Sequence, residues 1–139
     1  MSSYPEFTLR PVGYIRSELR HRADAPKQNF EGAPDAWLDI LPAFGDALNG
    51  LAEGQEIILV TWFHAANRDR LAVHPRGDAT IPLAGVFATR SPDRPNPLGL
   101  HRVTLRKIDR LRLRLGPIEA IDGTPVVDLK PVLSESRDS

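Results

Sequence analysis

Residues 85–100 read GVFATRSPDRPNPLGL, and no other stretch of the chain carries so many constraints on its conformation. Prolines at positions 92, 95 and 97 fix φ and remove backbone donors, so the segment cannot be the interior of a helix or a central strand. We therefore predict a rigid loop that follows a strand. Arg90, Arg94 and Asn96 on such a loop would be pre-oriented donors for a carboxylate, a phosphate or a base edge. Taken alone, the stretch could also be a proline-rich surface turn with solvated arginines.

Short apolar pieces lie on both sides of this loop, separated by many of the 13 prolines and 10 glycines of the chain. Their β-branched and aromatic residues favour strands. Leucines at positions 111, 113 and 115 alternate with arginines, which is typical of a strand with one buried face. Residues 57–63 are almost continuously apolar, as expected of a strand covered on both sides. We expect strands at residues 8–16, 37–41, 56–63, 84–88, 101–108, 111–115 and 126–132.

One stretch, residues 42–51, looks helical, because Pro42 suits a first turn and Phe44, Leu48 and Leu51 would share a face. Many short strands separated by turn signals predict a mostly β fold, either an antiparallel barrel or a sandwich, with one short helix. Closure into a barrel would also remove exposed strand edges. We expect a single domain over residues 1–133 and a disordered tail over residues 134–139.

The composition of the chain excludes several classes of protein. With 139 residues, of which 41% are apolar, the chain can bury a core without metals or disulfides. It has no cysteine, which excludes disulfides, thiolate metal sites and a cysteine nucleophile. None of the four histidines has the spacing of a zinc protease motif, so we predict no metal. Because the sequence shows neither an export signal nor an apolar run of roughly 18 residues, we expect a cytoplasmic protein without membrane contact.

Charge is balanced over the whole chain, with 18 basic and 18 acidic residues, which argues against nucleic-acid binding by overall electrostatics. The distribution is uneven, however. Residues 18–56 contain eight acids and three Lys or Arg residues, whereas residues 102–114 contain six Lys or Arg residues and one acid. The second stretch would give either a basic face for RNA or a merely solvated sheet surface.

Two further segments carry polar groups. Residues 121–131 read IDGTPVVDLKP, where Asp122 and Gly123 between apolar runs are typical of a hairpin turn. His64 follows Trp62 and Phe63 at the end of an apolar strand. By itself, His64 would either bind a ligand or cap the strand end.

Together these segments closely resemble the TsaA-like family of β-barrel methyltransferases, whose signature reads much like GVFATRSPxRPNPIG. The blocks VGYIRS at residues 12–17, WFH at residues 62–64 and DGTPVVDLKP match the family as well, so the resemblance covers roughly residues 8–131. It implies a small closed antiparallel β-barrel, a class VIII methyltransferase fold, that binds S-adenosyl-L-methionine and forms a homodimer. The sequence has no Gly-x-Gly-x-x-Gly, the fingerprint of a Rossmann-type dinucleotide site, which agrees with this.

The resemblance also implies a substrate and a binding site. Characterised relatives methylate N6 of threonylcarbamoyladenosine beside the anticodon of threonine tRNA. We expect Arg90 to bind the carboxylate of the cofactor and Glu119 its ribose diol or ammonium group. Phe30 and Leu100 would contact the adenine. The full set of cofactor-binding residues implied is Gln28, Asn29, Phe30, His64, Ala65, Arg90, Leu100, Gly116, Pro117, Ile118 and Glu119.

Methyl transfer is an in-line displacement at a carbon that the sulfonium already activates, so the protein mainly has to position the acceptor. The nitrogen of a substituted adenine is a weak nucleophile. A carboxamide or carboxylate that accepts its proton would make the lone pair more reactive. Asn96 and Asp122 are therefore the candidate catalytic residues.

The sequence departs from the family in several places. Residues 54–56 read GQE where relatives often have a Ser-His pair, residues 117–119 read PIE in place of Ser-Leu-Asp, and Val132 replaces a Tyr. Better-known bacterial relatives also continue into a second domain thought to help with tRNA. Two alternatives to tRNA methylation stay open: methylation of a small molecule or another RNA, and a regulatory module that binds the cofactor without catalysis. A purely structural β domain is a third.

Overall fold

The structure, a computed structural model, describes residues 4–25 and 32–133. Most of its regular structure is strand, together with short 3-10 helices. The strands are β1 (Gly13–Arg16), β2 (Ala36–Ile40), β3 (Glu56–Trp62), β4 (Ala72–Val73), β5 (Ala84–Gly85), β6 (Leu98–Asp109), β7 (Arg112–Gly116) and β8 (Pro125–Pro131). The 3-10 helices are η1 (Arg22–Asp24), η3 (Pro42–Leu48), η4 (Pro75–Gly77) and η5 (Val86–Ala88).

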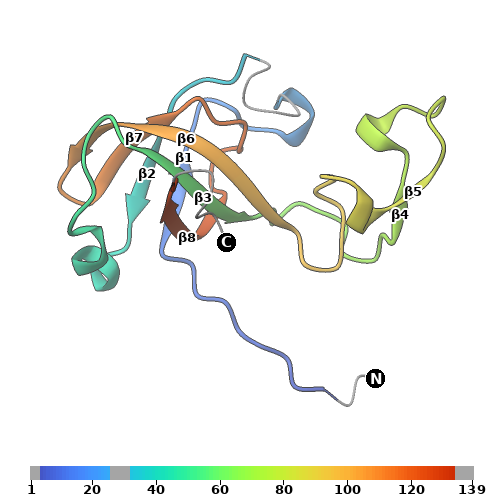
Figure 1. The fold of residues 1–139 in the computed structure, drawn as a ribbon, viewed down its shortest axis with the longest axis horizontal. Helices are drawn as coiled ribbons and strands as arrows, with labels where there is room; N and C mark the ends of the chain where they lie inside the picture. The colour runs from blue at the N-terminus through green and yellow to red at the C-terminus, as the bar shows by residue number, and fades with distance from the viewer. Residues whose placement is uncertain (1–3, 26–31, 134–139) are drawn as a thin grey trace.

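Six strands close into an antiparallel barrel in the order β1-β2-β7-β6-β3-β8, and β8 pairs with β1 to complete the circle (Figure 1). The long strand β6 pairs with β3 along its first part and with β7 along its second part. Closure gives every barrel strand two neighbours and so removes free edges. The mostly β fold with a closed antiparallel barrel is confirmed.

The barrel core follows the two-residue period of its strands, because successive side chains point to opposite faces. Leu113 and Leu115 of β7 are fully buried, whereas Arg112, the first residue of this strand, is exposed. The same alternation runs through β1, β2, β3 and the first part of β6. The remaining buried apolar residues of this core are Ile15, Ala36, Leu38, Ile40, Ile57, Leu59, Val103, Leu105, Ile118, Ala120 and Val126.

Between β3 and β6 the chain leaves the barrel and forms a lateral arm, residues 63–97, seen on the right in Figure 1. The arm contains the two-stranded sheet of β4 and β5 and the helices η4 and η5. The prolines predicted to form a rigid loop lie in its returning part. The arm is therefore built on the connection between two neighbouring barrel strands.

Several predicted boundaries were wrong. Residues 8–12 lie in no strand, and β1 begins at Gly13. The predicted strand at residues 84–88 ends at Gly85 and continues as η5, since the Arg94 side chain binds the carbonyl of Val86 there. Strand β6 begins at Leu98 rather than residue 101, because the backbone is free to pair with β3 directly after Pro97. The last residues of the proline-rich stretch are thus strand.

Two other expectations needed correction. The helical stretch is a 3-10 helix that ends at Leu48, although Phe44, Leu48 and Leu51 do pack on the core together. The expectation that strand β3 is covered on both faces was wrong. Every second residue of this strand, from Glu56 to Trp62, is exposed or only half-buried. A barrel strand has one inward and one outward face, which explains the difference. The predicted tail, residues 134–139, lies outside the described residues.

Candidate functional site

A cavity of about 870 Å³ lies where the arm meets the barrel. This volume falls within the range of roughly 300–1,000 Å³ that is common for small-molecule sites. Its walls come from five parts of the chain: η1, the start and middle of the arm, the proline-rich loop, the start of β6 and the segment before β8. The lining includes residues 63–66, 87–94, 98–100 and 119–121.

The proline-rich loop that forms one wall is held by the side chain of Arg94. Its Nε donates to the carbonyl of Ser91 at 2.9 Å, and its Nη2 donates to the carbonyls of Val86 and Thr89. Arg94 therefore has a structural role in this loop, and its predicted role as a donor toward a ligand stays a prediction. Arg90 lines the same cavity and is exposed, and we find no partner for its guanidinium within residues 4–25 and 32–133.

Asp93 fixes this loop to two distant segments. Its carboxylate pairs with Arg22 of η1 at 2.9 Å and accepts the backbone N–H of Asn67 at 2.8 Å. The hydrogen bond from Arg22 holds the pKa of Asp93 below its ordinary value, partial burial opposes this shift, and the Asn67 amide lowers the pKa further. The carboxylate thus stays ionised and keeps the cavity wall in place.

A buried chain of three polar side chains ends in the cavity. The Oγ1 of Thr61 lies 2.7 Å from Nε2 of His101, and Nδ1 of His101 lies 2.6 Å from Oε1 of Glu119. The imidazole is fully buried, and the carboxylate is 14% exposed. The second oxygen of Glu119, Oε2, is buried and has no partner among the described residues. A buried acceptor without a donor is costly, so Oε2 is placed to receive a donor from a ligand.

Charges around the cavity are predominantly positive. Five arginines contribute to its walls, against the carboxylates of Asp93 and Glu119. Arg22 is neutralised by Asp93, and Arg94 is engaged with backbone carbonyls. Arg70, Arg76 and Arg90 line the cavity as well. Such a cavity favours a ligand that carries an anionic group as well as a donor.

The structure brings together five of the residues that the sequence assigned to cofactor binding. His64, Ala65, Arg90, Leu100 and Glu119 all line the cavity, although they lie up to 55 residues apart in the chain (119 minus 64). Their individual contacts with a cofactor stay predictions.

The other predicted cofactor residues are placed differently. Ile118 is fully buried in the barrel core, and its N–H donates to the carbonyl of Pro34 at 2.9 Å. Gly116 is buried against Asp35, and neither it nor Pro117 is among the lining residues of the cavity. From residues 116–119, therefore, only Glu119 reaches the cavity. Gln28, Asn29 and Phe30 lie outside the described residues.

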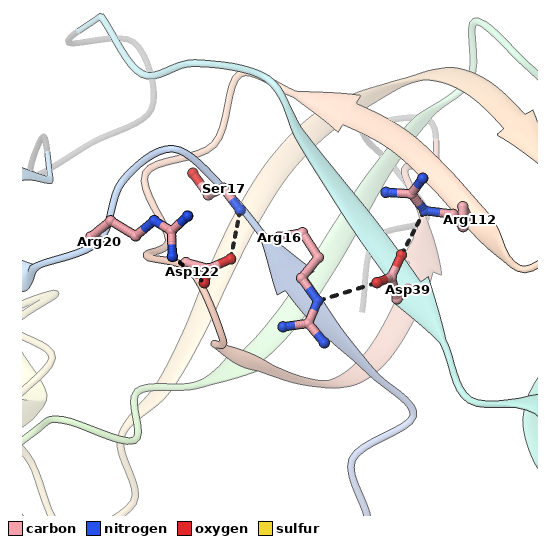
Figure 2. A network of polar contacts seen from close by, with 6 residues as sticks. All are labelled: Arg16, Ser17, Arg20, Asp39, Arg112 and Asp122. Atoms are coloured by element: carbon pink, nitrogen blue, oxygen red, sulfur yellow. Dashed lines mark hydrogen bonds and ion pairs between the residues drawn. The ribbon is translucent and has the colours of Figure 1, made fainter.

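The two candidate catalytic residues do not line this cavity. Asn96 is exposed, and its Oδ1 accepts a long hydrogen bond of 3.4 Å from Arg68. Asp122 lies on the barrel surface, where its carboxylate accepts the N–H of Ser17 at 3.0 Å and pairs with Arg20 at 3.4 Å (Figure 2). Asp122 thereby fastens the turn before β8 to the end of β1. Its catalytic role stays a prediction.

Sequence reasoning missed Thr61 and His101. The period of β6 would have indicated His101, because residues 99, 101, 103 and 105 share the inward face of this strand. A histidine on an otherwise apolar inward face requires polar partners. Those partners, Thr61 and Glu119, come from a neighbouring strand and a distant loop, so only the fold identifies them.

Three of the six basic residues of the stretch at residues 102–114 are paired with acids. Arg102 binds Glu56 at 2.8 Å, Arg106 lies 3.4 Å from Asp35, and Arg112 binds Asp39 at 2.9 Å. Figure 2 shows Asp39 between Arg16 and Arg112. The acids come from the acidic stretch of residues 18–56, so the two uneven regions of the sequence neutralise each other on the barrel surface.

No group of three or more His, Cys, Asp and Glu side chains within residues 4–25 and 32–133 is arranged to hold a metal ion. In the same part of the chain, every helix is too short or too polar to cross a membrane.

Comparison with known proteins gives consistent matches. The profile of the tRNA-methyltransferase O N-terminal domain family matches residues 14–138. A protein of Methanocaldococcus jannaschii, described as a "probable S-adenosyl-L-methionine-binding protein", is 46% identical over 95% of this chain and 96% of its own length. An "S-adenosyl-L-methionine-binding protein" of Archaeoglobus fulgidus is 37% identical over 88% of this chain and 86% of its own.

Among solved structures, TrmO from Pseudomonas aeruginosa superposes with a TM-score of 0.75 and 32% identity. The match covers 97% of this chain and 60% of the solved chain. The chain thus spans about three-fifths of the length of that solved protein.

Proposed function

The chain belongs to the family of the tRNA-methyltransferase O N-terminal domain, and we propose that it binds S-adenosyl-L-methionine in the cavity between arm and barrel and transfers its methyl group to tRNA. The proposed acceptor is N6 of threonylcarbamoyladenosine beside the anticodon of threonine tRNA, which implies a cytoplasmic protein. Two relatives described as binding this cofactor support the cofactor assignment. The likeness to TrmO supports methyl transfer.

One observation carries the proposal: the cavity is lined by a cation, Arg90, and by a residue with a buried acceptor, Oε2 of Glu119, and neither group has a partner within residues 4–25 and 32–133. The guanidinium of Arg90 suits the carboxylate of the cofactor. The free Oε2 of Glu119 suits its ammonium group or a ribose hydroxyl. Leu83, Phe87 and Leu100 add the apolar wall that an adenine needs. The residues present therefore fit the chemistry of this cofactor.

When bound, S-adenosyl-L-methionine supplies a methyl group activated by its sulfonium charge. The protein then has to hold the acceptor nitrogen in line and shield it from water. The rigid loop fastened by Arg94 and Asp93 gives one side of the cavity a fixed shape for this purpose. Asn96 lies in this loop between Pro95 and Pro97, and we propose that its Oδ1 accepts a hydrogen bond from the N–H of the acceptor nitrogen, whose proton is released to solvent once the bond to the methyl carbon has formed.

For the approach of RNA we propose the mouth of the cavity rather than the face formed by residues 102–114. Arg70 and Arg90 line the cavity, whereas Arg102, Arg106 and Arg112 of the other face are paired with acids. Phosphate contacts require cations that are accessible at the surface.

Calorimetric titration with S-adenosyl-L-methionine tests the binding proposal. We expect Arg90→Ala to weaken binding by about tenfold to a hundredfold, as for the loss of a hydrogen bond to a charged group. Arg110→Ala, at the exposed β6–β7 turn, is the matched control and should bind normally. Wild-type protein that does not bind the cofactor would contradict the proposal.

Methyl transfer to threonylcarbamoylated and unmodified tRNA, followed with a radiolabelled methyl group, tests the acceptor. We expect transfer only to the modified tRNA, and we expect Asn96→Ala to lower the rate by about a hundredfold without changing cofactor affinity. Asp122→Asn should mainly lower stability, because Asp122 holds Ser17 and Arg20. Tight cofactor binding without turnover on any tRNA would instead support a regulatory module, and turnover on another RNA or a small molecule would support a changed acceptor.

A further inference from the structure

We infer that His101 is a positioning residue that fixes the carboxylate of Glu119 so that Oε1 is committed to the imidazole and Oε2 stays free for a hydrogen-bond donor of the ligand. This inference rests on the proposed function, since the ligand is taken to be S-adenosyl-L-methionine. The donor is either the ammonium group or a ribose hydroxyl.

The bonding pattern determines which nitrogen of His101 carries a hydrogen. An ionised carboxylate can only accept, so Nδ1 must donate to Oε1 of Glu119 across 2.6 Å. In the neutral imidazole Nε2 is then an acceptor, and it can receive the hydroxyl hydrogen of Thr61 across 2.7 Å. The three side chains thus form a directional chain from Thr61 through His101 to Glu119.

Packing holds this chain rigidly. The side chain of His101 is fully buried, and the ring of Phe63 meets it edge-on with 5.8 Å between ring centroids. Gly99 lies two residues before His101 on the same face of β6 and packs closely against Thr61. A Cβ built on Gly99 would lie 2.6 Å from Oγ1 of Thr61, so the Thr61 side chain has no space to move on that side. A carboxylate held by one oxygen in such surroundings presents the other in a fixed direction, which lowers the entropy cost of binding.

A purely structural histidine would not require this arrangement. If His101 only filled the barrel, its polar partners would be satisfied within the protein. Instead the chain ends in a buried oxygen that has no donor among the described residues and belongs to a residue lining the cavity. The protein satisfies both nitrogens of the imidazole and leaves the missing hydrogen bond on Oε2 of Glu119, a residue that lines the cavity.

The test compares a substitution of His101 that keeps a donor in place of Nδ1 with a substitution that removes this donor. In His101→Asn the amide can replace Nδ1 as donor to Glu119, so binding of S-adenosyl-L-methionine should stay within about threefold of wild type. In His101→Leu the donor is lost, and we expect binding to weaken by about tenfold to a hundredfold. Val103→Ala, on the same face of β6, is the control for lost core packing: its melting temperature should fall while its affinity stays unchanged.

A double-mutant cycle shows whether His101 acts through Glu119. We expect His101→Leu combined with Glu119→Gln to bind no more weakly than Glu119→Gln alone. Additive losses would overturn the inference, as would normal binding by His101→Leu. Titration with 5′-methylthioadenosine, which keeps the diol and lacks the amino acid, identifies the donor. If the donor is a hydroxyl, Glu119→Gln weakens the binding of this compound as well. If the donor is the ammonium group, Glu119→Gln leaves the binding of this compound unchanged.

A measurement without cofactor keeps this inference separate from the proposed function. Nitrogen-15 NMR of the imidazole should show Nδ1 protonated and Nε2 unprotonated at neutral pH, and Thr61→Val should shift the Nε2 resonance. The opposite tautomer would refute the inference even if the protein binds the cofactor. The expected tautomer in a protein that does not bind the cofactor would support the chain of hydrogen bonds while refuting the proposed function.

Discussion

At the scale of single residues, Gly99 shows how closely the cavity and the barrel core share space. Gly99 is the first inward-facing residue of β6 and lies next to Thr61 and Phe63. Thr61 belongs to the buried polar chain, and Phe63 belongs to the cavity wall. A side chain at this position would press on both. The requirement for glycine here comes from close approach of side chains and not from a special backbone angle.

We predict that Gly99→Ala destabilises the protein by about 1–3 kcal/mol, as is typical of overpacking in a core. The added Cβ would lie 2.5 Å from the Phe63 ring and 2.6 Å from Oγ1 of Thr61. Urea denaturation measures the change. Gly85→Ala is the matched control, because the nearest atom to its Cβ is 3.9 Å away, and it should be tolerated. Equal stability of the two variants would show that the contact at Gly99 relaxes freely.

At the scale of elements, the proline-rich loop is held by its neighbours as well as by its prolines. Arg94 ties it to the strand-to-helix transition at Val86, and Asp93 ties it to η1 and to the start of the arm. Three segments that are distant in sequence thus depend on one carboxylate. The loop was predicted to be rigid, but the contribution of η1 could not be foreseen.

The lowered pKa of Asp93 predicts a pH-dependent contribution to stability. A carboxyl whose pKa is depressed in the folded state stabilises the protein fully above its unfolded pKa, about 3.9, and this contribution is lost as pH falls through the lower folded value. We expect Asp93→Asn to lower the free energy of unfolding by about 0.5–1 kcal/mol at pH 7, since the partner Arg22 is half-exposed.

Urea denaturation of wild type and Asp93→Asn between neutral and strongly acidic pH measures this contribution. The difference between the two proteins should shrink as the solution becomes acidic. In an Arg22→Gln background the effect of Asp93→Asn should be smaller at pH 7. If the difference in the free energy of unfolding between the two proteins stays constant with pH, the charge of the Asp93 carboxylate does not contribute to its contacts with Arg22 and Asn67.

At the scale of the whole molecule, large apolar side chains stay exposed on the arm and at the start of β6. Leu71 is 71% exposed and Phe87 is 86% exposed, and Leu83, Leu98 and Leu100 are also exposed. Monomeric proteins seldom leave such residues clustered at the surface. Of these residues, Leu71 lies outside the cavity. The homodimer implied by the family resemblance would cover Leu71, and we propose that the arm contributes to its interface.

Analytical ultracentrifugation tests this arrangement. We expect the wild type to sediment as a dimer and Leu71→Glu to sediment as a monomer, because a buried charge without a partner would disrupt an apolar interface. Leu71 does not line the cavity, so the variant leaves the proposed cofactor contacts intact. Lys107→Glu, exposed on β6 of the barrel, is the control and should stay dimeric. A monomeric wild type would contradict the proposal.

The sequence by itself determined the class of fold, the barrel strands apart from their ends, and the stretch that carries the cavity wall. Alternation of buried and exposed residues is local, and Leu113 and Leu115 of β7 show it directly. The prolines at positions 92, 95 and 97 also act locally, since they restrict the backbone wherever they occur. The residues His64, Arg90 and Glu119 were named from the family resemblance and lie on the same cavity.

Only the tertiary structure decided which polar groups meet. His101 finds Thr61 across a strand pair and Glu119 in a loop beyond β7. Acids of residues 18–56 pair with Arg102, Arg106 and Arg112 of β6 and β7. The tertiary structure also shows that Asp122 fastens the turn before β8 to the end of β1, while its catalytic role stays a prediction. Hydrogen bonds and ion pairs depend on distances of about 3 Å between residues far apart in the chain. Those distances are set by strand register and barrel closure, which no local pattern contains.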